Sequence, residues 1–68
     1  MNRNELIEKL TYLIEKYVPK EKKRHFDSYF LKEEIPVKAV LADFNKYSEE
    51  MTDEDDGKLI QEIYFFNC

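Results

Sequence analysis

The stretch LIEKLTYLIEKY, which runs from Leu6 to Tyr17, decides the fold of this chain. Large apolar side chains recur in it at alternating steps of four and three residues, the period of one face of an α-helix. The stretch therefore predicts an amphipathic helix with a single apolar stripe. The residues of the stripe are Leu6, Leu10, Leu13 and Tyr17, with Ile7 and Ile14 on the same side.

Residues on both sides of this stretch mark the ends of the helix. Asn2 followed by Glu5 is typical of a capping box, in which the first side chain accepts a hydrogen bond from the backbone three residues later. Pro19 restricts Val18 to extended conformations, so we expect the helix to end there.

Two prolines mark the starts of further helices. Pro19 and Pro36 each suit the first position of a helix, where a missing N–H has no consequence. We expect the second helix to end near Glu34 and the third helix to follow Pro36. Helical spacing is kept by Phe26, Tyr29 and Phe30 in the second helix, and by Val37, Val40, Leu41, Phe44, Tyr47 and Met51 in the third.

The last segment has a start signal of its own, Thr52 with Asp55 three residues later. Leu59, Ile60, Ile63 and Tyr64 then continue the helical period. A short strand over residues 58–66 is the alternative, because the preceding glycine weakens a helix and the aromatic ending favours a strand. With a helix here, residues 1–68 form one all-α domain, a small compact bundle or orthogonal array of about four short helices.

Length and composition restrict what such a domain can hold. A chain of 68 residues builds one core, and with one histidine and one cysteine it can assemble neither a disulfide framework nor a Cys/His metal cluster. We expect no cofactor, and self-association as a homodimer is an open way to gain stability. No apolar stretch reaches the roughly 20 residues that span a bilayer, so we expect a cytoplasmic protein without a membrane contact.

Six acidic residues occur within eight positions, and they are candidates for partner binding: Glu49, Glu50, Asp53, Glu54, Asp55 and Asp56. A calcium loop is excluded, because with Gly57 as its glycine the closing carboxylate would fall at Ile63. Two interpretations stay open. The run is either a solvated surface or a patch that meets a basic protein, and such a patch could imitate nucleic-acid phosphates.

A basic run at the start of the second helix is the alternative candidate: Lys20, Lys22, Lys23 and Arg24. The helix dipole disfavours cations there, so their position needs an explanation. They could pair with the acidic start of the fourth helix. They could instead contact phosphates, with Phe26 and Tyr29 as stacking groups, in a dimer whose second and third helices form a helix-turn-helix. The net charge of -4 disfavours this second reading.

No constellation typical of catalysis is present, so we do not expect an enzyme. His25, Ser28 and Cys68 stand without a nucleophile–base motif, and the chain has no glycine-rich phosphate loop.

An excess of aromatic residues gives the functional expectation. Three consecutive helical residues cannot all face one core, yet Tyr64-Phe65-Phe66 and Tyr29-Phe30-Leu31 are such runs. We therefore expect a small acidic protein-binding regulator or inhibitor, of the kind that neutralises another protein, with Tyr64, Phe65 and Phe66 as anchors. At least one of the two phenylalanines should be exposed. The residues expected in the core are Leu10, Leu13, Val40, Leu41, Phe44 and Ile63.

Overall fold

The computed structural model describes residues 1–67, and within them every regular element is helical. Cys68 lies outside the described residues. The expected all-α fold is confirmed, and residues 58–66 lie in a helix rather than a strand. In chain order the elements are α1 (Arg3–Tyr17), the 3₁₀ helix η1 (Lys20–Lys22), α2 (Lys23–Phe30), α3 (Val37–Phe44), the 3₁₀ helix η2 (Asn45–Glu50) and α4 (Glu54–Asn67).

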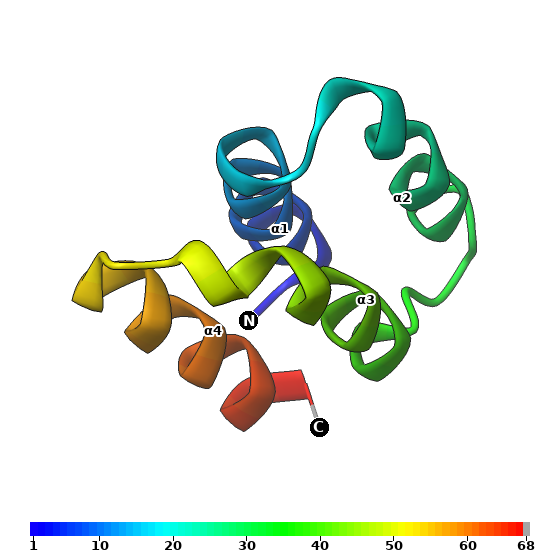
Figure 1. Ribbon diagram of the computed structural model, residues 1–68. Helices are drawn as coiled ribbons and strands as arrows, with labels where there is room; N and C mark the ends of the chain where they lie inside the picture. The colour runs from blue at the N-terminus through cyan, green and yellow to red at the C-terminus, as the bar shows by residue number, and fades with distance from the viewer. Residues whose placement is uncertain (68) are drawn as a thin grey trace.

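The elements surround one core. α1 packs against both α2 and α4, and α3 packs against α4. In Figure 1, α2 lies at the upper right, α3 and η2 follow one another across the front, and α4 returns beneath them. None of the described helices is both long enough and apolar enough to pass through a bilayer.

The ends of α1 agree with the sequence signals. The Asn2 side chain accepts a hydrogen bond of 2.8 Å from the backbone N–H of Glu5. At the other end, Val18 is extended before Pro19, and its N–H still donates to the carbonyl of Ile14. A cap at one end and a proline after the other thus set the length of this helix.

The second helix is shorter than the sequence suggests. Pro19 precedes a turn of 3₁₀ helix, and α2 ends at Phe30 rather than near Glu34. Beyond Phe30 the chain carbonyls turn toward α1, where the Arg3 guanidinium donates to the carbonyl oxygens of Phe30 (3.1 Å), Lys32 (2.8 Å) and Glu33 (2.6 Å). A side chain distant in sequence therefore satisfies the carbonyls at this helix end, which a local pattern cannot reveal.

The third and fourth helices also differ at their ends from the expected positions. After Phe44 the chain tightens into η2, in which the Ser48 hydroxyl donates to the Asn45 carbonyl at 2.9 Å. Asp53, not Thr52, caps α4: its carboxylate accepts from the backbone N–H of Asp55 at 2.9 Å. The start signal therefore predicted the correct helix but placed its cap one residue too early.

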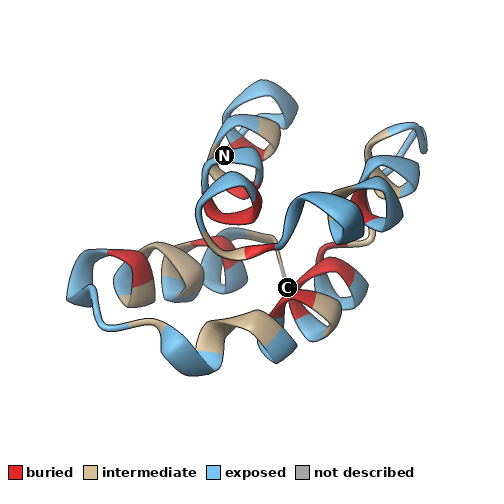
Figure 2. Cartoon of the chain, turned by 45° about the horizontal axis from the view of Figure 1, so that its top comes forward, coloured by how far each residue is buried: buried red, intermediate tan, exposed pale blue. Residues whose placement is uncertain are grey.

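The core contains all six residues expected there. Figure 2 shows the buried positions on the helix sides that face one another. Partly buried Tyr47 and Met51 of the η2 region pack against this cluster, so the third apolar stripe continues past the end of the α-helix. The buried apolar residues are Leu6, Leu10, Leu13, Ile14, Val18, Phe26, Ile35, Val37, Val40, Leu41, Phe44 and Ile63.

Candidate protein-binding surface on the outward side of α4

A buried carboxylate attaches the start of α4 to α1. Asp56 is only 2% exposed. One carboxylate oxygen accepts a hydrogen bond from the hydroxyl of Tyr12 (2.9 Å), and the other accepts from Lys16 Nζ (2.8 Å) and from the hydroxyl of Tyr17. Three donors replace the water that the carboxylate loses on burial, so its charge can be kept inside the fold.

These contacts change the pKa values of the groups involved. The hydrogen bond from Lys16, followed by that from Tyr17, holds the pKa of Asp56 below its ordinary value. In turn the carboxylate of Asp56 raises the pKa of the Lys16 ammonium group and that of the Tyr17 hydroxyl. At neutral pH Asp56 is therefore a carboxylate, Lys16 an ammonium group and Tyr17 a neutral phenol.

Two further polar side chains of α4, Glu62 and Asn67, make contacts in the middle and near the end of the helix. Lys9 Nζ lies 2.7 Å from a carboxylate oxygen of Glu62, in the middle of the helix. Near its end, the Asn67 amide donates to the carbonyl of Ile63 at 2.9 Å and lies 3.6 Å from the sulfur of Met1. Polar contacts with α1 thus position the start and middle of α4, Asn67 near its end contacts Met1, and Ile63 is buried in the core.

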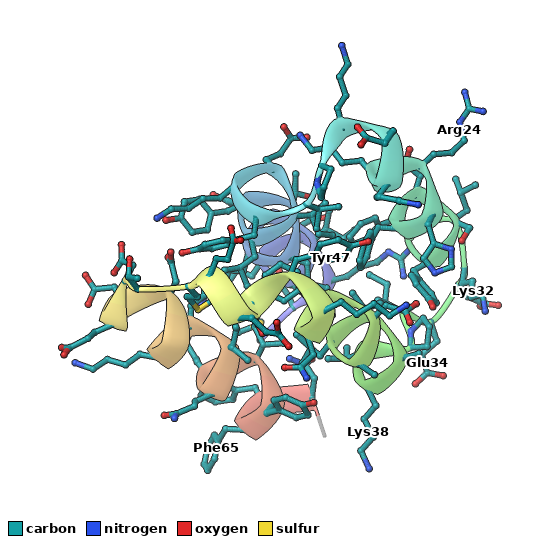
Figure 3. The ribbon with its side chains drawn as sticks, in the orientation of Figure 1. Arg24, Lys32, Glu34, Lys38, Tyr47 and Phe65 are labelled. Carbon is teal, nitrogen blue, oxygen red and sulfur yellow. The ribbon has the colours of Figure 1, made fainter. Side chains whose placement is uncertain are left out.

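The opposite side of α4 exposes aromatic rings. Phe65 is 82% exposed and Phe66 56%, which confirms the expectation that at least one ring lies outside the core. The two rings meet edge to face, with centroids 5.1 Å apart and planes at 88°. Figure 3 shows Phe65 pointing away from the ribbon at the lower left. Tyr64 beside them is 43% exposed, so all three expected aromatic anchors reach the surface.

The acidic run is divided among several structural roles. Glu49 and Glu50 end η2 and are exposed, and Glu54 and Asp55 are exposed in the first turn of α4. Asp53 is the helix cap and also lies 3.4 Å from Lys16 Nζ. Asp56 fits neither interpretation, and its place among the partner-binding candidates is wrong, because its carboxylate is buried against α1. The acidic run therefore keeps five surface candidates for partner binding: Glu49, Glu50, Asp53, Glu54 and Asp55.

The basic run does not pair with the start of α4. Lys23 lies 3.0 Å from Glu15 of α1, while Lys20, Lys22 and Arg24 are exposed, and Arg24 points outward in Figure 3. The residue that meets the acidic start of α4 is instead Lys16. The sequence interpretation missed it together with Tyr12 and Tyr17, because contacts across 39 to 44 positions leave no local signal.

The aromatic groups proposed to stack beside the basic run have other roles. Phe26 is buried in the core, and the Tyr29 hydroxyl donates to Asp43 of α3. The same carboxylate lies 2.8 Å from His25 Nε2, so this cluster connects α2 to α3. The hydrogen bond from Tyr29, and next that from His25, lower the pKa of Asp43. Neither ring presents a free stacking face of the kind that single-stranded nucleic acid uses.

A cavity of about 260 Å³ lies between the start of α1 and the segment that precedes α3. Leu6, Ile35 and Val37 line it on the apolar side, and Arg3, which also lines it, is engaged with backbone carbonyls. Over residues 1–67, no three His, Cys, Asp or Glu side chains converge in the way that a metal site requires. The exposed aromatic side of α4 is the stronger candidate site.

Comparison with protein-family models, with curated proteins and with solved structures found no match for this chain.

Proposed function

We propose that this chain is a small acidic binding protein that regulates or inhibits another protein through the outward side of α4. The observation that carries the proposal is the pair of exposed rings, Phe65 and Phe66, on a helix that is otherwise well packed. Aromatic side chains that fill pockets of a partner dominate the binding energy of many protein interfaces.

The attachment of α4 to the rest of the fold supports this function. Asp56 and Glu62 attach its start and middle to α1, and Asn67 near its end contacts Met1. A rigid helix loses little conformational freedom when it binds, and affinity rises as that cost falls. The exposed carboxylates on the same region favour a partner with a basic surface, which includes proteins that handle nucleic acids.

The proposal is tested by affinity capture from an extract of the cells that make the chain, with and without nuclease. We expect a protein that is retained after nuclease treatment, and that is lost when Phe65→Ser and Phe66→Ser are combined. Leu31→Ser is the matched control, because Leu31 is an apolar side chain that is 87% exposed on the loop after α2. The proposed function is contradicted if no captured protein is lost in the double variant. It is also contradicted if nuclease treatment removes every captured protein.

A further inference from the structure

The outward side of α4 has two chemically different ends. Phe65 and Phe66 follow Glu54 and Asp55 by eleven residues, and at about 100° per residue they return to within about 20° of the same direction. At about 1.5 Å per residue the two ends lie about 16 Å apart along the helix axis. Buried Asp56 and Ile63 are on the opposite side. We call the exposed residues Glu54, Asp55, Lys58, Gln61, Phe65 and Phe66 the α4 face.

The two carboxylates of the α4 face, Glu54 and Asp55, form no ion pair within residues 1–67. Asp53 and Asp56 lie against Lys16, and Glu62 lies against Lys9. By contrast, the ion pairs formed within residues 1–67 include neither Glu54 nor Asp55. Lys58 is one turn away, and no ion pair joins it to them. The net charge of -4 further favours a cationic occupant.

A second copy of the chain does not complement the α4 face. Parallel pairing would bring Glu54 and Asp55 of both copies together, and like charges in an interface are costly. Antiparallel pairing would place the phenyl rings of each copy on the carboxylates of the other, where the negative ring face and the loss of water both disfavour the charge. Nucleic acid is disfavoured by the same carboxylates.

We infer that the α4 face docks a basic, amphipathic segment of another protein, with Phe65 and Phe66 in an apolar pocket and Glu54 and Asp55 on arginine or lysine side chains about 16 Å away. This inference rests on the proposed function, and it names the chemistry of the partner. Arginine suits the acidic end, since its guanidinium pairs with carboxylates in two-point fashion. The order of charges and rings along one helix sets the orientation of the bound segment.

The test uses a synthetic amphipathic peptide with arginines at one end and leucines at the other, titrated into the ¹⁵N-labelled chain. A matched peptide carries glutamines in place of the arginines. We expect saturable binding of the arginine peptide, chemical-shift changes centred on the α4 face, and affinity about fivefold or more above that of the glutamine peptide.

Variants of the chain locate the contact. Phe65→Ser should weaken binding of the arginine peptide about tenfold, and Glu54→Gln with Asp55→Asn about fivefold. Glu49→Gln with Glu50→Gln is the control, because it removes the same charge from exposed positions outside α4 and should change affinity less than about twofold. Circular dichroism checks that each variant keeps its helices.

Several results overturn the inference: no saturable binding of the arginine peptide, shift changes away from α4, or equal losses for the two charge variants. Concentration-dependent self-association that Phe65→Ser abolishes also overturns it, since the α4 face would then be a homodimer contact. These failures are distinguishable from failure of the proposed function. If capture of a cellular protein depends on Phe65 and Phe66 but not on Glu54 and Asp55, the proposed binding function stands. Only the inference that the partner segment is basic is then contradicted.

Discussion

Asp56 shows how a single residue can be acidic in sequence and internal in structure. Its carboxylate is buried under donors from Tyr12, Lys16 and Tyr17, all on α1, and it is therefore a contact between two helices rather than part of a solvated run. Leaving a buried donor or acceptor without its partner costs about 1 to 3 kcal/mol. The first prediction concerns this residue.

Asp56→Asn should lower the free energy of unfolding by about 1 kcal/mol or more, because the amide lacks the charge that pairs with Lys16 and has an N–H in place of one acceptor oxygen. Asp55→Asn is the matched control. It removes the same charge from the same helical turn, but its side chain is exposed, so we expect a change within about 0.5 kcal/mol. Urea unfolding of both variants measures the difference, and equal losses would mean that helix-dipole charge, not the buried contact, is what matters.

A signal for the burial of Asp56 was present in the sequence. Asp56, Ile60 and Ile63 are spaced by four and three residues, which is the step of an apolar helical stripe, so the fourth acidic residue in a row of four falls on the inward side. The identity of its donors could not be predicted in the same way. Lys16 lies 40 positions away, and the pairing depends on how α1 and α4 cross.

At the scale of the element, apolar spacing and prolines predicted which segments are helical better than where they end. The Leu6 to Tyr17 stripe gave α1 with its cap and its end, because both end signals are local. The end of α2 depends instead on Arg3, about thirty positions away, and no local rule contains it. The end of α3 at Phe44 and the start of α4 after the cap Asp53 are likewise not marked by apolar spacing, which continues through η2 to Met51.

The surface of α4 was predictable for a simple geometric reason. Tyr64, Phe65 and Phe66 are consecutive, and successive residues of a helix turn by about 100°, so a helix with one buried side must expose part of the run. The structure agrees, with Ile63 buried and Phe65 outward. The sequence did not distinguish Glu54 and Asp55 from the neighbouring Asp53 and Asp56. It does not show which of these carboxylates have a lysine partner in the fold.

Gly57 is a place where α4 can be improved. It lies within the helix, its backbone φ is not positive, and a Cβ added to it meets nothing within 4 Å. Gly57→Ala should therefore raise the free energy of unfolding by about 0.5 to 1 kcal/mol, since alanine loses less backbone entropy on folding and no contact opposes it. Chemical denaturation tests this, with Lys58→Ala as an exposed control in the next position that should change little. A loss of stability in Gly57→Ala would show that this turn needs the freedom of glycine.

At the scale of the whole molecule, two carboxylates connect helices in addition to the apolar core. Asp56 joins α4 to α1, and Asp43 joins α3 to α2 through Tyr29 and His25. Each carboxylate thus joins one pair of α-helices, α1 with α4 and α2 with α3. A small domain has few buried layers, so a modest number of such contacts is a large share of its total stability.

These two groups predict how the molecule responds to acid. In the folded chain the pKa of Asp56 and that of Asp43 lie below the ordinary value of 3.8. A carboxyl group whose pKa is lower in the folded state stabilises the fold fully above its unfolded pKa, and this contribution is lost as the pH falls through the folded pKa. Stability should therefore hold from neutral pH down to about 4 and then decline, as far as these two groups decide it.

The measurement is the free energy of unfolding in urea from about pH 6 to about pH 2, for the parent chain and for Asp43→Asn combined with Asp56→Asn. At neutral pH the double variant should be the less stable protein, and the gap should narrow as the pH falls, because acid removes from the parent the same charges that the variant lacks. Glu49→Gln with Glu50→Gln is the control: both side chains are exposed and neither joins two helices, so its curve should run parallel to that of the parent. A gap between parent and Asp43/Asp56 variant that stays constant with pH would mean that the two carboxylates act through packing, and not through their charge.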